Sequence, residues 1–499
     1  MKVSRFALIA SLTALLVAAL SGCSGTAAPG GGPKTLTVGF TLEPDTLDLT
    51  TSSAASIPQL LLYNVYETLV RMDATGAIKP LLATDYTVSS DGKRYTFDLD
   101  PKATFASGTP VDAAAVVAGI NRMRQATSAT IKTQMSVIAD VAAVNPTTVV
   151  VTLSQPSNFW LFNMTTTAGI IVDPAITDLA TQPMGSGPYE LETWTKGDSI
   201  TLKKNPAYWG APGRFDQVVF RYMADPNAMV SAMLSGGLDI AAELTSPDSL
   251  TRFADTSKYT VIQGTTNGEV TLGFNFDRQP LRSLQVRQAI CHAIDRQALL
   301  DSVWGGKGAL IGSMVAPTDP YYQDLSGTYP YDPAKARQLL AAAGYATGLT
   351  LDLKVPITPY ATPAARVVAS DLEAVGITVK VTELDFSGQW LPDVFLGGDY
   401  DLTIVDHAEP RDIVNFADPT YYWHYNNPEF ADLIGQADAA PYDQFITDMR
   451  QAAQMLADDA AADWLFLFPN LVVARAGISG IPDNAITPSF DLTTIDATD

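Results

Sequence analysis

The sequence predicts an α/β protein with more than one domain, and three observations lead to that prediction. The chain has 499 residues, which is too long for a single core of ordinary size. Hydrophobic residues make up 47% of the chain and charged residues 17%, as in globular domains. Between residues 349 and 384 a strand pattern, a helix pattern and another strand pattern follow one another, which favours parallel strands joined through a helix.

The first half of the chain alternates between strand and helix patterns. Strict alternation of apolar and polar residues predicts strands, and apolar residues three or four apart predict helices. The predicted strands are 35–40, 94–100 and 147–153, and the predicted helices are 57–70 and 109–123. A turn is expected at Gly185-Ser-Gly-Pro-Tyr189.

The second half contains helices with recognisable ends. A helix over 225–234 stops at glycines, and a helix over 332–344 has Asp332 as N-cap, Pro333 in its first turn and Gly344 at its exit. One further helix is predicted from apolar residues between Val286 and Leu299. The remaining predicted elements are the strands 200–203, 349–355 and 378–384 and the helix 362–375.

The net charge of −22 excludes a nucleic-acid partner, because neutralising phosphates requires clustered Lys and Arg.

The N-terminus has the pattern of a secretory signal. Lys2 and Arg5 precede an apolar run over 6–20, and small residues then lead to Cys23. This arrangement resembles a bacterial lipobox, which implies a signal peptide over 1–22 and acylation of Cys23. Residues 23–34 are then a flexible tether to the outer face of a membrane. The alternative is an ordinary signal peptide with a cysteine there by chance.

The cysteine count limits the chemistry of the mature chain. Without Cys23 only Cys291 remains, so neither an internal disulfide nor a multi-cysteine metal site is expected. Cys291 falls within a predicted helix and is interpreted as a small core residue.

Motifs that suggest catalysis or nucleotide binding do not meet the requirements of those chemistries. Gly185-Ser-Gly187 lacks the spacing of a nucleophile elbow, and Gly305-Gly-Lys-Gly308 lacks the outer residues of a phosphate loop. Asp458, Asp459 and Asp463 are predicted to lie on one helix with their charged side towards water. We therefore expect a protein that is not an enzyme and needs no cofactor.

Seven stretches, in order along almost the whole mature chain, resemble the extracytoplasmic solute-binding proteins of peptide-type ABC importers. They are Leu47-Asp48; Tyr66-Glu-Thr-Leu69; Gly76–Ala83; Tyr95-Thr-Phe97 with Phe105–Pro110; Gly185–Tyr189 with Asn205–Trp209; Val286–Ile290 with Ala293-Ile-Asp-Arg296; and Tyr331-Asp-Pro333 with Ala343-Gly-Tyr345.

The resemblance implies a periplasmic-binding-protein fold of type II, large peptide-binding subclass. Two α/β lobes would meet at a hinge, with an extra domain inserted in the first. The corresponding boundaries are 35–70, 185–265 and 471–499 for lobe one, 71–184 for the insertion and 266–470 for lobe two. A peptide or other small solute would bind between the lobes of a monomer and pass to membrane permease subunits.

The segment 401–413 concentrates charge in a chain that has little. In peptide-binding members of the family, an aspartate that follows a lobe-two strand receives the α-ammonium group of the peptide. The Glu409-Pro410 pair aligns Asp406 with that position, and Thr403, Val405 and His407 lie beside it. Thr403 and Val405 replace the tryptophan and alanine of the family motif, so the wall of the first side-chain pocket differs.

Other interpretations of this segment remain open. Asp406, His407, Glu409 and His424 could hold a metal ion, although their spacing matches no known structural site, and we expect none. An acid–base catalyst would need an oriented pair that the sequence does not identify. Glu409, Arg411 and Asp412 are predicted to form solvated or interlobe ion pairs, and Asp406 itself either contacts ligand or pairs within the protein.

Four further residues are candidates for the wall of the cleft. Ser53 and Ala54 match the lobe-one segment whose backbone faces the ligand. Trp390, and Trp423 in an aromatic run, follow lobe-two elements and could line side-chain pockets. The alternative for each is packing in the core.

These inferences together predict a lipid-anchored substrate-binding component of an ABC importer, with di- or oligopeptides as ligands. The alternatives are the same role for a metal chelate, glycoside or opine-like solute, and an extracellular hydrolase.

Overall fold

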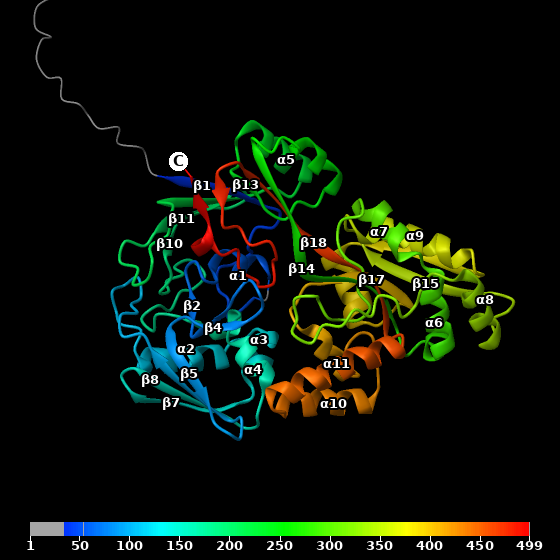
Figure 1. Cartoon of the computed structure of the whole chain (residues 1–499), viewed down its shortest axis with the longest axis horizontal. Coiled ribbons are helices and arrows are strands. Elements are labelled where there is room, and N and C mark those ends of the chain that lie inside the picture. The colour runs from blue at the N-terminus through cyan, green and yellow to red at the C-terminus, as the bar shows by residue number, and fades with distance from the viewer. Residues whose placement is uncertain (1–33, 53, 499) are drawn as a thin grey trace, which may run out of the picture.

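A computed structural model describes residues 34–52 and 54–498, and the chain folds into two lobes (Figure 1). The predicted signal peptide, Cys23, the tether up to residue 33 and Ser53 lie outside the described residues. Among the described residues, no helix is both long and apolar enough to cross a membrane.

One ten-stranded sheet runs through both lobes. The strands of lobe one are β10 (Tyr189–Thr195), β11 (Ser199–Lys204), β12 (Gln217–Tyr222), β1 (Thr35–Phe40) and β13 (Ile240–Ala241), in that order. The central pair, β18 (Ala462–Arg475) and β14 (Tyr259–Phe274), follows, and lobe two adds β17 (Leu402–His407), β15 (Leu349–Pro356) and β16 (Ile377–Leu384). β1 is parallel to β12 and β13, and β15 is parallel to β16 and β17.

The two long central strands carry the chain between the lobes (Figure 1). They pair antiparallel with each other, β18 also pairs with β13 in lobe one, and β14 also pairs with β17 in lobe two. Their register is interrupted between Thr265 and Glu269. The predicted lobe boundaries at residues 265/266 and 470/471 fall inside these strands, and their exact positions stay predictions.

A second, four-stranded antiparallel sheet lies beside lobe one, within the segment predicted as an insertion. Its order is β5 (Ala83–Val88), β6 (Arg94–Leu99), β8 (Thr148–Leu153) and β7 (Ile138–Asn145). The helices α2 (Ala113–Arg124), α3 (Ala129–Met135) and α4 (Asn158–Asn163) belong to the same segment. Its apolar side chains share one continuous core with those of lobe one.

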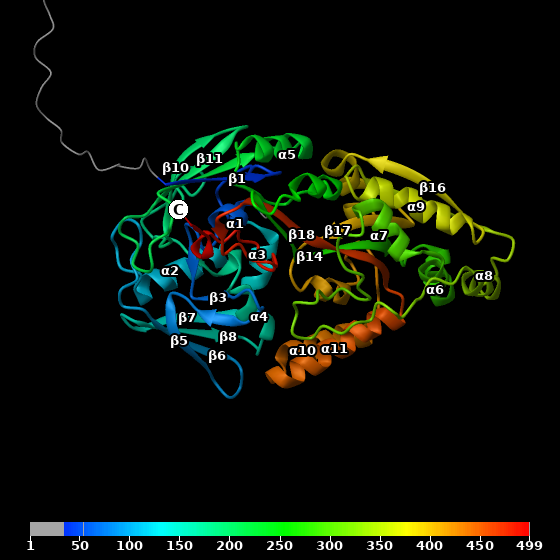
Figure 2. The same ribbon diagram turned by 45° about the horizontal axis from the view of Figure 1, so that its top comes forward.

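Two hydrophobic cores pack against the lobe-two sheet, and the helices that contribute to them can be followed in Figure 2. One is formed with α6 (Leu284–Ala293), α7 (Arg296–Trp304), α8 (Pro333–Ala342) and α9 (Ala361–Glu373). The other is formed with α10 (Pro428–Ala439), α11 (Tyr442–Asp458) and the helical segment Phe386–Leu396. In lobe one, α5 (Pro226–Ser235) packs near β13 in a smaller core. Apart from short 3-10 turns, the remaining described elements are α1 (Ser56–Leu61), β2 (Glu67–Thr68), β3 (Val70–Met72), β4 (Ile78–Pro80), β9 (Ile170–Ile171), β19 (Ile478–Ser479) and β20 (Asp496–Ala497).

Most of the predicted elements are confirmed, including the caps of α8. The Asp332 carboxylate accepts the Lys335 amide at 2.9 Å, and Gly344 has φ of 93°, a left-handed conformation that glycine adopts without strain. Cys291 is buried in α6, as predicted.

The predicted helix over 57–70 is wrong beyond its first half. α1 ends at Leu61, Tyr63 adopts a left-handed φ of 63°, and β2 and β3 follow. Leu60, Leu61 and Val65 are buried, as a helix would also require. Their spacing reflects a segment that is enclosed on all sides, where periodicity cannot separate helix from turn and strand.

The single helix predicted between Val286 and Leu299 is two helices. Ile294 is extended, and Asp295 caps α7 by accepting the Ala298 amide at 3.0 Å. This cap favours the start of a new helix at Asp295, because the carboxylate accepts an amide of the first turn of α7 that has no partner within that helix.

The aspartates predicted on one water-facing helix are also separated. α11 ends at Asp458, whereas Asp463 lies in β18, is 3% exposed and stands 3.8 Å from the Arg296 guanidinium. A charged partner 167 residues earlier in the chain is not visible in local sequence, and this partner makes burial of Asp463 possible.

Two of the seven motif stretches, Tyr66–Leu69 and Gly185–Tyr189 with Asn205–Trp209, meet around one buried carboxylate in lobe one. Glu67 accepts hydrogen bonds from the Tyr208 hydroxyl at 2.7 Å and the Trp209 indole at 2.9 Å. Gly187 packs against the chain before Glu67, and a Cβ at this glycine would lie 2.4 Å from the Asn64 carbonyl oxygen. Burial raises the pKa of Glu67. These motifs therefore build the lobe, which explains why they identify a fold better than a ligand.

Candidate functional site

The candidate site lies at the carboxyl end of β17, where the two lobes approach each other. A cavity of about 10 Å³ at this point is lined from both sides. Met72, Gly76, Phe162 and Ile486 come from the lobe-one side, and Asn267, Thr318, Asp319, Pro410 and Arg411 come from the lobe-two side. The loop that follows β17 therefore reaches the space between the lobes through Pro410 and Arg411, beside the kind of strand end where α/β proteins bind ligands.

Asp406 occupies the end of β17 with one carboxylate oxygen unpaired. The residue is half-buried, yet its Oδ1 has almost no exposed surface and no hydrogen-bond partner among the described residues. Its amide donates to the Tyr360 hydroxyl at 3.0 Å. A Cβ at Gly268 would lie 2.9 Å from Oδ1 and 3.2 Å from the Phe468 ring, so the carboxylate and the ring border the same small space.

The surroundings of Asp406 oppose its ionisation. The pKa of this carboxyl is raised from 3.8 to about 7, mainly by burial, with smaller raising contributions from Glu409 and Asp412 and a lowering contribution from His407. Tyr360 and Phe468 pack edge-to-face with ring centroids 5.2 Å apart. A carboxylate beside aromatic rings, without a cation of its own, is suited to receive one.

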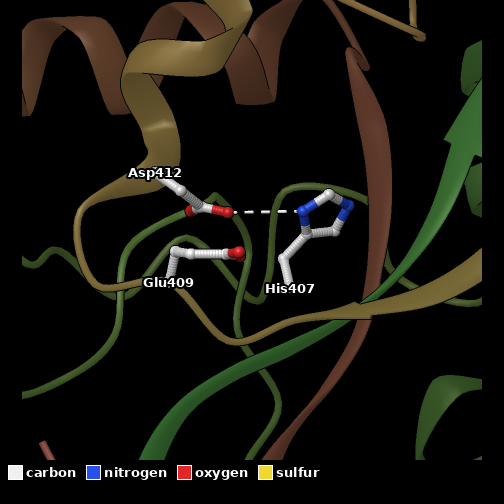
Figure 3. A group of neighbouring side chains, drawn as sticks. All are labelled: His407, Glu409 and Asp412. Atoms are coloured by element: carbon white, nitrogen blue, oxygen red, sulfur yellow. Dashed lines mark ion pairs between the residues drawn. The ribbon is translucent and has the colours of Figure 1, made fainter. Parts of the chain in front are cut away.

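His407 projects from the opposite face of β17 and pairs with Asp412 (Figure 3). Its Nδ1 is 3.3 Å from the Asp412 carboxylate, and its Nε2 is 2.8 Å from the Tyr422 hydroxyl. Both members of the pair are buried, whereas Glu409 is exposed. Burial raises the pKa of Asp412, and the hydrogen bond with His407 lowers it.

More charge is buried behind this pair. Glu269 stands opposite His407 in the β14–β17 register and is 3% exposed, and its pKa is raised by burial and by neighbouring carboxylates. Arg411 lies 3.4 Å from Asp319 and packs over the Phe162 ring at 3.9 Å. Arg411 and Asp412 thus each have a charged or titratable partner, but both pairs are largely buried and lie within lobe two, so the prediction of solvated or interlobe pairs is wrong for them. Arg411 reaches the lobe-one side through its contact with the Phe162 ring.

The metal set considered from sequence is not assembled. Asp406 and His407 are consecutive strand residues and point to opposite faces, and His424 instead lies 3.7 Å from Asp277. A different group, His407, Glu409 and Asp412, has ligand atoms within 4.8 Å of one another and could hold a cation. Both imidazole nitrogens already have protein partners there, so a cation would have to displace the contact between His407 and Asp412.

The other predicted lobe-two residues pack beneath the site. Thr403 and Val405 are buried, and the Trp390 indole donates to the Thr403 hydroxyl at 3.1 Å. Trp423 is fully buried, stacked on Phe416 with centroids 4.0 Å apart. In this conformation the two tryptophans support β17, and a ligand could touch them only if this aromatic packing opened.

Ala54 belongs to the other lobe. It is half-buried against the lobe-one core just before α1, and its amide donates to the Ser52 hydroxyl at 3.3 Å. The structure therefore brings Thr403, Val405 and His407 together with the two tryptophans on one face of β17. It places Asp406 on the other face of this strand, and Ala54 apart from all of them on lobe one.

Sequence reasoning missed Glu269, Tyr360 and Phe468. Glu269 carried a signal, because it is a lone carboxylate at the start of an apolar strand pattern, Glu269-Val-Thr-Leu-Gly-Phe274. No local pattern marks Tyr360 or Phe468 as part of the site. Tyr360 precedes α9 and Phe468 lies in β18, and only the tertiary fold brings both residues to Asp406.

The fold is that of a two-lobed binding protein, and the family match gives its class as a solute-binding protein of ABC importers. The family model for bacterial extracellular solute-binding proteins, family 5 Middle, matches residues 77–430. The chain belongs to this family, whose relatives found here are substrate-binding proteins rather than enzymes. The resemblance inferred from the seven stretches is confirmed.

Among curated relatives, the glutathione-binding protein GsiB of Escherichia coli O1:K1 / APEC is 31% identical over 349 residues, covering 68% of this chain and 67% of GsiB. Among solved structures, NikA from Brucella suis in complex with Fe(III)-EDTA has a TM-score of 0.82 at 22% identity, covering 93% of this chain and 100% of NikA. DppA from Helicobacter pylori in complex with the peptide STSA has a TM-score of 0.79 at 21% identity, covering 93% and 98%. These likenesses confirm the two-lobed fold.

Proposed function

We propose that this chain is a lipid-anchored substrate-binding protein that captures di- or oligopeptides between its lobes and delivers them to an ABC permease. The observation that carries the ligand class is the unpaired Asp406 Oδ1 near the end of β17, next to Tyr360 and Phe468. A free peptide N-terminus supplies the ammonium group that this carboxylate lacks.

The energetics of burial support this assignment. An ionised carboxylate without a partner is costly in a site that excludes water, and an ammonium with three donors removes that cost. The neighbouring rings of Tyr360 and Phe468 could contact the ammonium group of the peptide or the carbon atoms next to it. Backbone pairing with an extended peptide would add affinity that does not depend on its side chains.

Peptide ligands occur among the relatives, beside metal chelates and an opine. Glutathione, which names the GsiB relatives, is a tripeptide with a free α-amine, and DppA is described with a peptide. NikA, described with Fe(III)-EDTA, represents the alternative of a metal chelate.

The remaining parts of the proposal rest on the N-terminal sequence and on the family. Acylated Cys23 would hold a monomer at the extracytoplasmic face of the membrane, within reach of the permease. Without catalysis of its own, the protein would act by closing around its ligand.

The ligand can be identified directly. Native mass spectrometry of the purified protein, followed by denaturation and analysis of the released small molecules, is expected to show one or more short peptides. A sugar, an opine or a metal chelate as the retained molecule would reject the peptide assignment and leave the transport role standing. Hydrolysis products of an added peptide would instead support the extracellular hydrolase.

The raised pKa of Asp406 predicts a pH optimum for peptide binding. Because the carboxyl has a pKa of about 7 without ligand, and only its ionised form pairs with ammonium, affinity should fall about tenfold per unit as pH drops below 7. Affinity should also fall above about pH 8, where the peptide amine loses its proton. Calorimetric titration of a dipeptide between pH 5 and 9 tests this, and an acid limb that persists in Asp406→Asn would contradict it.

A further inference from the structure

A contact between the lobes, on the side away from the two crossing strands, joins the inserted segment to the end of α10. Figures 1 and 2 both place α4 against α10 and α11. The participating segments, 157–159 and 437–440, are about 280 residues apart in the chain. This contact can exist only while the lobes are close together.

Asp438 holds the inserted segment through two hydrogen bonds. Its carboxylate accepts the Ser157 hydroxyl at 2.9 Å and the Phe159 amide at 2.9 Å. The Phe159 amide is one of the donors left free in the first turn of a helix, so Asp438 completes the cap of α4 from the opposite lobe.

Asn158 makes the reciprocal contact with the end of α10. The last carbonyls of a helix have no partner within it, and the Asn158 side-chain amide donates to three carbonyl oxygens there. These are the oxygens of Ala437 at 3.1 Å, Asp438 at 2.9 Å and Ala440 at 2.8 Å. Phe159 adds an edge-to-face contact with Phe445, with centroids 5.4 Å apart.

We propose that this junction is a closure latch, in which Asp438 and Asn158 raise ligand affinity by stabilising the closed arrangement without touching the ligand. The inference extends the proposed function, since it assumes that the protein closes on a solute. Asp438 accepts hydrogen bonds from the start of α4, and Asn158 donates hydrogen bonds to carbonyl oxygens at the end of α10. Opening of the lobes would break both sets of hydrogen bonds together. Anything that stabilises the closed state raises the apparent affinity of a ligand that binds that state. Asp438 and Asn158 are thus positioning residues.

Cross-linking can measure the latch without knowing the ligand. Gln155→Cys and Ala439→Cys place exposed thiols beside the junction, in a chain whose described cysteine, Cys291, is buried. A short bis-maleimide joins them only when the lobes meet, and peptide mapping identifies the linked pair. With the latch intact, cross-linking should be about tenfold faster than in the same protein carrying Asp438→Ala or Asn158→Ala. Asp432→Ala, exposed on the same helix, is the matched control and should match the intact protein.

Equal rates in all four proteins, or no cross-link in any, would overturn the latch. Thermal unfolding distinguishes an effect on closure from an effect on folding. Asp438→Ala and Asn158→Ala should unfold at the same temperature as the Asp432→Ala control. If the unfolding temperature fell together with the cross-linking rate, the two residues would act in folding and the proposal would be rejected. A second arm adds glutathione or trialanine as probe. If neither probe changes the rate in the latch-intact protein, the peptide function fails, and the comparison among variants without probe still decides the latch.

Discussion

Replacing Asp406 with asparagine is expected to weaken the binding of a free-amine dipeptide by roughly 30- to 150-fold, which corresponds to about 2–3 kcal/mol for a charged hydrogen bond. The substitution keeps the shape of the side chain and removes the charge that would face the ammonium group. Oδ1 has no protein partner to lose among the described residues, so the change should leave unfolding stability intact or raise it. Calorimetric titration with the dipeptide, alongside thermal unfolding, measures both quantities.

Two comparisons isolate the ammonium from the general acidity of the site. The N-acetylated dipeptide should bind Asp406→Asn and the unmodified protein with similar affinity, because it has no ammonium to lose. Glu409→Gln removes an exposed carboxylate three residues away and should change the affinity for the free amine only slightly. If Asp406→Asn weakened both dipeptides equally, the ammonium role would be rejected.

Replacing Arg296 with alanine is expected to cost about 3–5 kcal/mol of unfolding free energy, as is usual when one member of a buried charge pair is removed. Arg296 is 8% exposed and donates to the carbonyl oxygens of Ile311 at 2.8 Å and Trp464 at 3.0 Å, and to that of Ser326. Loss of the Arg296 side chain leaves these carbonyl oxygens without a donor and leaves the buried Asp463 carboxylate without its cationic partner. Burial already raises the pKa of Asp463 to about 6.

Guanidinium unfolding followed by circular dichroism measures this effect. Arg366→Ala removes an exposed arginine whose ion pair with Glu383 spans 3.2 Å, and it should change stability by less than about 0.5 kcal/mol. Adding Asp463→Asn to Arg296→Ala should recover part of the loss, since it removes the stranded charge. If Arg296→Ala lowered the unfolding free energy only slightly and Asp463→Asn restored none of it, the expected cost of an unpaired buried Asp463 would be contradicted.

The fold was predictable where local signals and tertiary structure agree. Asp332 and Gly344 mark the ends of α8, and the strand–helix–strand pattern over 349–384 becomes the parallel pair β15 and β16. Prediction failed where burial on all sides removes periodicity, as in residues 62–70, and where a distant partner decides, as Arg296 does for Asp463. Local patterns contain no information about a partner far along the chain.

One residue of the candidate site, Asp406, could be predicted from the sequence, whereas its surroundings could not. Asp406 could be singled out because a carboxylate after an apolar strand is conspicuous and matches a family position. Its aromatic neighbours, and the fate of Trp390 and Trp423, depend on packing among segments that the sequence does not order in space. The same holds for the junction of Asn158 with Asp438.

The strand order of the large sheet also has a consequence for how the protein is made. β1, the first strand described, lies next to β13, and β13 pairs on its other side with β18, which follows all the lobe-two strands in the chain. The first lobe therefore cannot complete its sheet while the C-terminal segment is still inside the ribosome. Truncation at residue 470, the predicted end of lobe two, would keep most of the pairing of β18 with β14 and would remove Val473 and Ala474, which pair with β13. It would therefore leave lobe one, the lobe made first, without its last strand.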